Sequence, residues 1–489
     1  MSSPAPSAAE SVPGSSAAVT PGTSQPRPAG GGRGFDRSIV EGPIALAVWR
    51  IAWPTVLQNA IGGLQGIIDH AMVGHYVGFT GNAAIGVSWQ IFLVVIVFIS
   101  SLFTGMGVLV ARFAGANQPD RVNNTVYQAF LTSVVMAVGV MAPLGYFFSP
   151  WLLELVNATP EVRAEALPYL RTMFVFSLGL LLFFMLGGAL RSAGDARTPL
   201  RLGAAMTVLN IVLNVILIGG LGPIPAFGTR GAALGTVIAT SIVSGVALWM
   251  MCTGKLVVHF PRTMSWAPDW GIIRSLFRFG LPAGIQGVAM NVAGVLLLRF
   301  IGSLEHSAEA QAVYAVGYAE LFSLITWTSV GLMGAAAAVA GQNLGAGHPE
   351  RSMRAVHIAA RIGLGVAALV GGMFLLIPEM LLAIFGLEEP IVVSLGTQLL
   401  RYLSVSGFFI TVALTYTGGL QGTGDTRSPL VITLISQVAV PIGLCLFFQS
   451  TGILEPAEVW TAILLGHLTR CVLTVIRFRQ GKWRHIVVE

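Results

Sequence analysis

The sequence has little charge for its length. Of 489 residues, 10% are Asp, Glu, Lys or Arg and 54% are hydrophobic. A soluble globular protein carries roughly 25% charged residues, so this chain cannot cover a water-facing surface of its size. We therefore place the protein in a membrane. The net charge of +6 is explained by Lys and Arg in cytoplasmic loops, and we expect no nucleic acid partner.

Cysteine and the common catalytic signatures are also scarce. The three cysteines, Cys252, Cys445 and Cys471, lie far apart in the sequence, which gives no disulfide framework and no cysteine metal motif. There is no Gly-Lys-Ser/Thr phosphate loop, no metal-spaced His/Cys cluster and no nucleophile elbow. We therefore expect no enzyme activity, no cofactor and no metal. The lack of a phosphate loop also leaves the chain without a site for using ATP as an energy source.

Large apolar side chains are nearly absent from residues 1–38, which are mostly Ala, Ser, Pro and Gly. Such a segment cannot bury enough surface to offset the entropy of ordering. It also lacks the apolar stretch of a signal peptide. We expect a disordered cytoplasmic tail.

Long apolar runs fill the rest of the chain. A spanning helix needs about 20 mostly apolar residues, and the sequence contains twelve such segments. They lie near residues 46–73, 82–109, 123–148, 167–190, 200–220, 231–252, 272–301, 312–340, 355–376, 395–419, 430–450 and 458–478. The predicted fold class is all-α integral membrane, with twelve transmembrane helices.

The chain repeats itself: GALRSAGDARTPL (188–200) in its first half matches GGLQGTGDTRSPL (418–430) in its second half. The repeat predicts two parallel six-helix lobes around a central cleft, the architecture of a secondary transporter with alternating access. We place the lobes at 39–252 and 276–480. Residues 253–275 would be a cytoplasmic linker and 481–489 a cytoplasmic tail.

Lys and Arg are concentrated in the loops on one side of the predicted helices. Such a bias marks the cytoplasmic side of a membrane protein. It places both termini in the cytoplasm. We expect a monomeric, multi-pass protein of the plasma membrane.

Asp69 lies inside an apolar run, in the stretch GLQGIIDHAMVGH (63–75). An ionisable side chain at membrane depth costs about 2.5–3.5 kcal/mol on insertion scales. Helical spacing puts Gln58, Gln65 and Asp69 on one stripe, which should face the bundle. Desolvation favours the neutral carboxyl, so a buried Asp69 would bind a proton or a cation but not both, which suffices for antiport. The alternative is that Asp69 is solvated in the outer headgroup region.

Other polar residues accompany Asp69. Asn210 and Asn214 share one helix face, and they either hydrogen-bond Asp69 or hold helices together. Thr236 would face the same cavity. Glu320 is a possible second titratable group, although a structural role is equally compatible with its position.

The two G-D-x-R loops contain Asp195 with Arg197 and Asp425 with Arg427. Each Asp is expected to pair with the nearby Arg and to cap a helix. Their symmetric placement favours folding or gating contacts between the lobes over binding of cargo.

These features together resemble the multidrug and toxic compound extrusion (MATE) family. The resemblance covers nearly the whole chain from about residue 40 and is carried by WPTVLQNAIGGLQGIIDHAMVGHYVG, AGQNLGAGHPERSMRAV and the two G-D-x-R loops. It implies export of amphipathic, often cationic, organic compounds driven by H+ or Na+.

Within that family the chain is most similar to the DinF-like branch, which has an acid matching Asp69 on the first helix. The branch commonly has Asn-x-x-x-Asp on the fifth helix, whereas this chain has Asn210 and Asn214. Fewer negative ligands weaken binding of a hard cation. The departure favours H+ coupling through Asp69 alone.

Two other functions remain open from the sequence. One is transport of a specific metabolite or a lipid-linked precursor, although the cleft-facing segments lack the Lys and Arg expected for a pyrophosphate-linked lipid. The other is a non-transporting receptor or scaffold, which has no need for two symmetric lobes.

Overall fold

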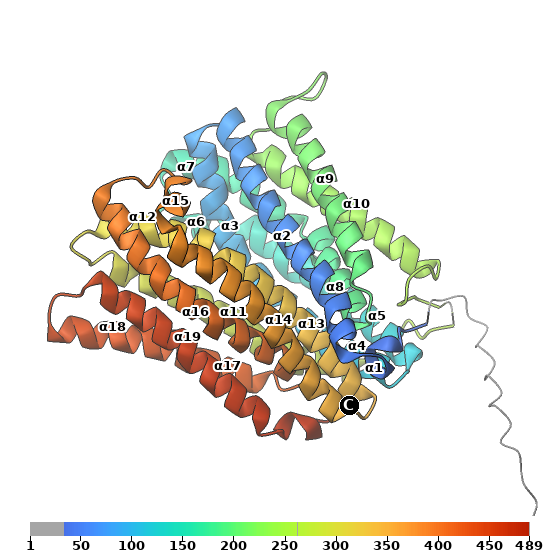
Figure 1. The fold of residues 1–489 in the computed structure, drawn as a ribbon. Coiled ribbons are helices and arrows are strands. Elements are labelled where there is room, and N and C mark those ends of the chain that lie inside the picture. The colour runs from blue at the N-terminus through green and yellow to red at the C-terminus, as the bar shows by residue number, and fades with distance from the viewer. Residues whose placement is uncertain (1–33, 262, 489) are drawn as a thin grey trace, which may run out of the picture. The chain divides into compact units, whose positions relative to one another are not determined.

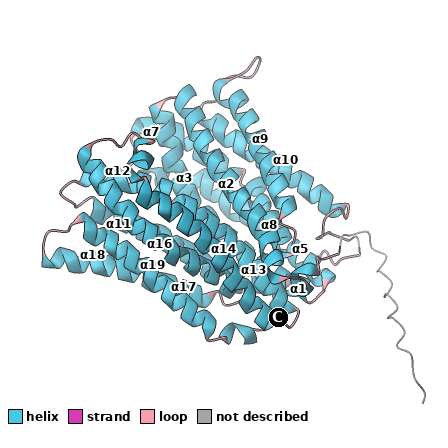
Figure 2. Ribbon diagram, in the orientation of Figure 1, coloured by secondary structure: helices cyan, strands magenta, loops and turns pink. Residues whose placement is uncertain are grey.

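The computed structural model describes residues 34–261 and 263–488, and this part of the chain is helical nearly throughout (Figures 1 and 2). Its one strand-like pairing is an isolated bridge between Leu221 and Ile224. Most of the expected disordered tail falls on residues 1–33, outside the described residues. The first helix, α1 (Ser38–Glu41), begins where that tail was expected to end.

We call α2 to α10 the first lobe and α11 to α19 the second lobe. The first lobe consists of α2 (Ile44–Tyr76), α3 (Phe79–Ser100), α4 (Leu102–Gly115), α5 (Pro119–Met136), η1 (Ala137–Met141), η2 (Leu144–Phe148), α6 (Ser149–Leu155), α7 (Pro160–Val175), α8 (Leu178–Ser192), α9 (Arg197–Gly219) and α10 (Thr229–Cys252). The second lobe consists of α11 (Trp270–Ile301), α12 (Ser307–Tyr314), η3 (Ala315–Leu321), α13 (Ser323–Gly345), α14 (Pro349–Leu376), α15 (Pro378–Ala383), α16 (Pro390–Thr423), α17 (Arg427–Thr433), η4 (Leu434–Ala439), α18 (Val440–Thr451) and α19 (Pro456–Arg479). A short 3-10 helix, η5 (Lys482–His485), follows α19.

Most of these helices are long and apolar enough to cross a membrane. Ten pass that test among the described residues, and the pair α7 and α8, bent by 52°, makes eleven. Helix α2 is not among them, because Gln58, Asn59, Gln65 and Asp69 interrupt its apolar sequence. Together with α2, the ten helices and the bent pair make twelve helical stretches among the described residues. Each corresponds to one of the twelve predicted segments.

Local sequence signals determine where some helices begin, in one case at matching positions of the two lobes. Pro119 opens α5 and Pro349 opens α14, at matching positions of the internal repeat. Proline is favoured in a first turn because its missing N–H has no partner there. The linker ends at Asp269, whose Oδ1 accepts hydrogen bonds from the backbone N–H groups of Gly271 and Ile272 and so caps α11.

The two lobes are in direct contact at one end of the bundle, which we call the basic end because both G-D-x-R loops and the last described residues lie there. At this end Gln342 Nε2 donates to the backbone oxygen of Ser192 over 2.7 Å. Helices α4 and α13 cross so closely that a Cβ on Gly115 would overlap the backbone of Gln342, and one on Gly345 would overlap the backbone of Arg112. Small residues permit this approach of two helix backbones.

Candidate functional site: a cavity around Asp69

The largest part of the site is a cavity of about 610 Å³ bounded mainly by first-lobe helices. Helices α2, α9 and α10, which pack in that order (Figure 1), all contribute residues to its wall. Most of its wall is apolar, and its large side chains are Trp89, Phe183, Phe184, Met206 and Trp327. The predicted stripe of Gln58, Gln65 and Asp69 also lines it. The cavity therefore offers broad apolar contact with a few convergent polar groups, as ligand sites do.

Asn214 is the nearest polar partner of Asp69. Its Nδ2 donates to Asp69 Oδ1 over 2.7 Å, from α9 to α2. Asn214 is fully buried, whereas Asp69 is only partly buried. Asp69 itself lines the cavity, so its carboxyl group is available to a proton or a ligand there.

Asn210 lies one turn before Asn214 and is also fully buried. Side-chain amides are oriented from their partners, and Asn210 fits best with its nitrogen 3.0 Å from Asp69 Oδ1. Its oxygen then accepts a hydrogen bond from the Thr236 hydroxyl over 3.2 Å. Nearby, the hydroxyl of Thr207 donates to Gln65 Oε1 over 3.0 Å. The structure thus brings together Gln65, Asp69 and both asparagines, with Thr236 behind them.

Gly235 on α10 makes room for this arrangement. A Cβ at that position would overlap Asn214 Oδ1. That oxygen is buried and has no hydrogen-bond partner among the described residues. The close approach of α10 leaves the Asn214 amide little room to move away, and the hydrogen bond to an ionised Asp69 keeps the nitrogen on that side.

The chemistry of this group suits a carboxyl that changes its protonation state. Two amide N–H groups directed at one oxygen stabilise a carboxylate, because amides donate to it without carrying charge. An amide also has an acceptor oxygen, so a rotated asparagine can accept from a protonated carboxyl. The surroundings therefore satisfy Asp69 in either state.

Glu320, the possible second titratable group, lies on η3 and is exposed; it does not line this cavity. At the position of the second lobe that corresponds to Asp69, Leu297 is buried in an apolar cluster. The structure thus does not bring Glu320 to Asp69.

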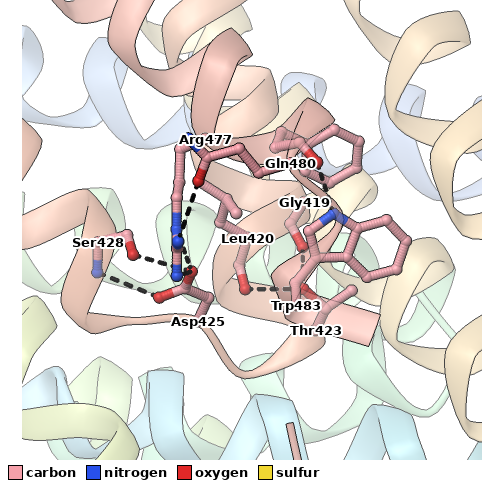
Figure 3. Close-up of polar contacts among 9 residues, drawn as sticks. Gly419, Leu420, Thr423, Asp425, Ser428, Arg477, Gln480 and Trp483 are labelled. Carbon is pink, nitrogen blue, oxygen red and sulfur yellow. Dashed lines mark hydrogen bonds and ion pairs between the residues drawn. The ribbon is translucent and has the colours of Figure 1, made fainter. Parts of the chain in front are cut away.

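The two G-D-x-R loops cap helices, but the local ion pairs expected within them do not form. Asp195 accepts from the backbone N–H and the hydroxyl of Thr198 over 3.0 and 2.6 Å. Asp425 accepts from Ser428 in the same way, over 3.1 and 2.9 Å. Its ion-pair partner is Arg477 of α19 at 2.8 Å, not Arg427 (Figure 3).

The physical reason is geometric. Arg197 and Arg427 begin the helices that follow the two capping carboxylates and are exposed, whereas α19 brings Arg477 alongside Asp425. The first lobe has Ala247 at the place that matches Arg477. Asp195 and Arg197 form no ion pair within the described residues.

Several cavity residues were not predicted from the sequence. Trp327 comes from the second lobe, and a Cβ on Gly63 of α2 would overlap its ring; no local signal places an α13 side chain there. Tyr169 and His70 line the same cavity. Arg191 lies outside this cavity, in the lining of a neighbouring hollow, and the repeat, which aligns it with an uncharged Gln421, is the one signal that could have singled it out.

Comparison with known proteins agrees with this architecture. The MatE family model matches two separate stretches, residues 54–216 and 282–447. One stretch lies in each lobe, as the predicted duplication requires.

Among similar proteins, the probable multidrug resistance protein NorM of Thermotoga maritima is 28% identical over 443 residues, covering 89% of this chain and 92% of that protein. Multidrug resistance protein MdtK of Pectobacterium atrosepticum is 25% identical, covering 88% and 94%. A solved outward-facing structure of a multidrug resistance MATE family transporter of the MOP superfamily superposes with a TM-score of 0.83 at 21% identity, covering 92% of this chain and 98% of that one.

Proposed function

Since this chain belongs to the MatE family and is a membrane transporter rather than an enzyme, we propose that it exports amphipathic organic compounds, cations among them, in exchange for H+. The observation that carries the proposal is Asp69, a carboxyl held by buried amides in the wall of a large apolar cavity. A proton entering at Asp69 would displace a cationic cargo leaving by alternating access of the two lobes.

The cavity wall supports a broad range of cargo. Met206 and the aromatic side chains Trp89, Phe183 and Phe184 provide apolar contact without demanding one shape, and methionine adapts to many ligands. The names of the relatives point the same way, since both are described as multidrug resistance proteins.

The donor set around Asp69 favours H+ over Na+. It contains one carboxylate, with asparagine amides rather than a second acid, and a hard cation prefers several negatively charged oxygens. The position of Asp69 on the first spanning helix is similar to that of the acid in the DinF-like branch, while Asn214 departs from that branch. We propose that coupling passes through Asp69 alone.

We further propose that the basic end faces the cytoplasm of a cell whose plasma membrane holds the protein as a monomer. The Lys and Arg bias of the loops supports that orientation. It would place both chain ends inside.

Transport by purified protein in vesicles that are acidic inside tests the proposal. Native protein should take up a fluorescent organic cation, and a protonophore should abolish the uptake. Asp69→Asn should reduce gradient-driven uptake at least tenfold, because the neutral amide cannot carry the proton. Glu320→Gln is the matched control and should transport like the native protein.

Three outcomes would contradict the proposal. Native protein that moves no organic cation would favour the specific metabolite or lipid-linked precursor. Uptake by Asp69→Asn at the native rate would show that Asp69 does not couple transport to the proton gradient. Uptake that depends on an imposed Na+ gradient and not on the pH gradient would show that the coupling ion is Na+ and not H+.

A further inference from the structure

A hollow of about 490 Å³ lies at the basic end of the first lobe and shares no lining residue with the Asp69 cavity. Its wall is formed by residues just before α1, by α2, by the loop between α8 and α9, and by the first turns of α9. Three arginines line it, Arg50, Arg197 and Arg201, and we call it the basic hollow. Guanidinium groups gathered around one space favour an anionic ligand, phosphate above all.

Two carboxylates also line the basic hollow, and both already have partners. Asp195 accepts hydrogen bonds from the backbone N–H and the hydroxyl of Thr198, one at each of its oxygens. Asp36 Oδ2 lies 3.4 Å from Arg50 Nη1. These acids therefore account for one of the three arginines at most.

The other two arginines keep their charge free for a ligand. Arg197 and Arg201 are exposed and form no ion pair with any of residues 34–261 and 263–488. They lie one turn apart at the start of α9, which is long and apolar enough to span the membrane from Arg197 to Gly219. Both guanidinium groups are therefore placed at the level of the lipid headgroups.

The face of α9 that carries Arg201 is turned toward lipid. Helical spacing puts Arg201 on the side opposite Gly203 and Thr207, which line the Asp69 cavity. Further along α9 the same side is exposed and apolar, with Ala205, Val208, Val212 and Val215 at helical spacing. The basic hollow thus continues into an apolar stripe that runs along the membrane-spanning helix.

The internal repeat shows that the fold does not need an arginine at position 201. At the same offset that aligns Arg197 with Arg427, the second lobe has Val431, which is also exposed. A charge on a lipid-facing helix is costly unless it reaches the headgroups or an anion. Arg201, present in one lobe only, therefore points to a ligand that the first lobe binds and the second does not.

We propose that the basic hollow binds an anionic phospholipid from the leaflet at the basic end. Its phosphate is held by Arg197 and Arg201, with Arg50 beside them, and an acyl chain lies along the apolar stripe of α9. A free phosphate ion would occupy the hollow but would leave the stripe unused. In the proposed orientation this is the cytoplasmic leaflet, whose anionic lipids attract basic segments. The inference goes beyond the proposed function and does not depend on the cargo.

Native mass spectrometry of the purified full-length protein in nonionic detergent tests the assignment, because it counts bound lipids. The probes are dioleoyl phosphatidylglycerol, which is anionic, and dioleoyl phosphatidylcholine, which has the same chains and a neutral headgroup. The native protein should bind one phosphatidylglycerol about tenfold more tightly than phosphatidylcholine, whose choline group offsets the phosphate charge. Glycerol phosphate, added in about a hundredfold excess, should not displace the lipid, because it has no acyl chain to bury.

The double variant Arg197→Gln with Arg201→Gln should raise the Kd for phosphatidylglycerol about tenfold, because each basic side chain near an anionic headgroup contributes to binding. The matched control is Arg278→Gln with Arg427→Gln. It removes the same charge from exposed second-lobe positions that the repeat aligns with Arg50 and Arg197, and it should bind like the native protein. Because all four side chains are exposed, both variants should unfold at the native temperature without added lipid, which shows that they are folded.

Equal affinity of the native protein for the two lipids would overturn the assignment, as would an equal loss of binding in the control variant. Displacement by glycerol phosphate would assign the basic hollow to a soluble phosphate compound and would overturn the lipid. Each of these results would leave the proposed export function intact, since none of them measures transport.

Discussion

At the scale of single residues, the site depends on the orientation of one amide. Asn214 directs its nitrogen at Asp69 Oδ1 over 2.7 Å, and its oxygen lies against Gly235. A rotated Asn214 would place an acceptor against a carboxylate, which is unfavourable while Asp69 is ionised. The absence of a side chain at Gly235 thus contributes to the function of a residue on another helix.

We therefore expect Gly235→Ala to reduce cation uptake in vesicles at least tenfold. The new Cβ would overlap Asn214 Oδ1 and would displace the amide from Asp69; displacement of a group by about 1 Å can cost about a hundredfold in activity. Gly245→Ala is the control on the same helix, since no atom lies within 4 Å of its added Cβ. Equal uptake by the two variants would show that Asn214 does not depend on Gly235.

At the scale of elements, the crossing of α4 and α13 closes the basic end. Gly115 approaches the backbone of Gln342, and Gly345 approaches that of Arg112, so the two contacts are related by the internal duplication. Both partners are backbone atoms, which cannot rotate away as side chains do. The helices must separate if either glycine gains a side chain.

Gly115→Ala should destabilise the purified protein by about 1–3 kcal/mol, the usual range for overpacking a tight contact. Thermal unfolding in detergent measures the effect. Gly365→Ala on α14 should unfold at the native temperature or slightly above it, because nothing lies within 4 Å of its Cβ and alanine favours helix. A Gly115→Ala protein as stable as Gly365→Ala would contradict the role given to the crossing.

At the scale of the whole molecule, the last described residues tie the two lobes together. Arg112 of α4 donates to the backbone oxygen of Ile486 over 2.7 Å, and Val488 belongs to an apolar cluster made mainly by the first lobe. Arg484 pairs with Glu350 of the second lobe at 3.0 Å. This segment, predicted from the sequence as a cytoplasmic tail, packs against both halves of the protein.

Trp483 anchors that segment. It is 1% exposed, and its ring stacks on that of Phe478 with 5.0 Å between the ring centroids. Its Nε1–H donates to the backbone oxygen of Phe478 over 2.8 Å. The ion pair of Asp425 and Arg477 lies beside it (Figure 3). Trp483→Ala should lower stability by about 3–5 kcal/mol, as for other large-to-small changes at buried aromatics.

The same variant should loosen the basic end. In a background whose native cysteines are replaced, a cysteine at Ser192 should react faster with maleimide in Trp483→Ala than in the native sequence. Trp270→Ala is the matched control, because Trp270 is 76% exposed and should affect neither measurement. A stable Trp483→Ala protein with unchanged labelling would show that the segment does not hold the lobes together.

The duplicated loops illustrate which contacts the sequence can predict. Prolines, capping acids and the repeat itself predict helix ends, because these signals act within a few residues. The predicted partner of Asp425 was wrong, because Arg477 lies on a later helix and its approach depends on how α19 packs. Trp327 was missed for the same reason, since it reaches the Asp69 cavity from the other lobe.

The sequence by itself determined that this is a duplicated helical membrane protein with one acid deep in its first spanning helix. Apolar length, the repeat and helical spacing are local properties, and they need no knowledge of packing. Only the tertiary structure decided what surrounds Asp69 and that Arg191 reaches Gln58 on the same helix as Asp69. Those relations join α2, α8, α9, α10 and α13, and contacts between helices distant in sequence depend on how their surfaces pack together.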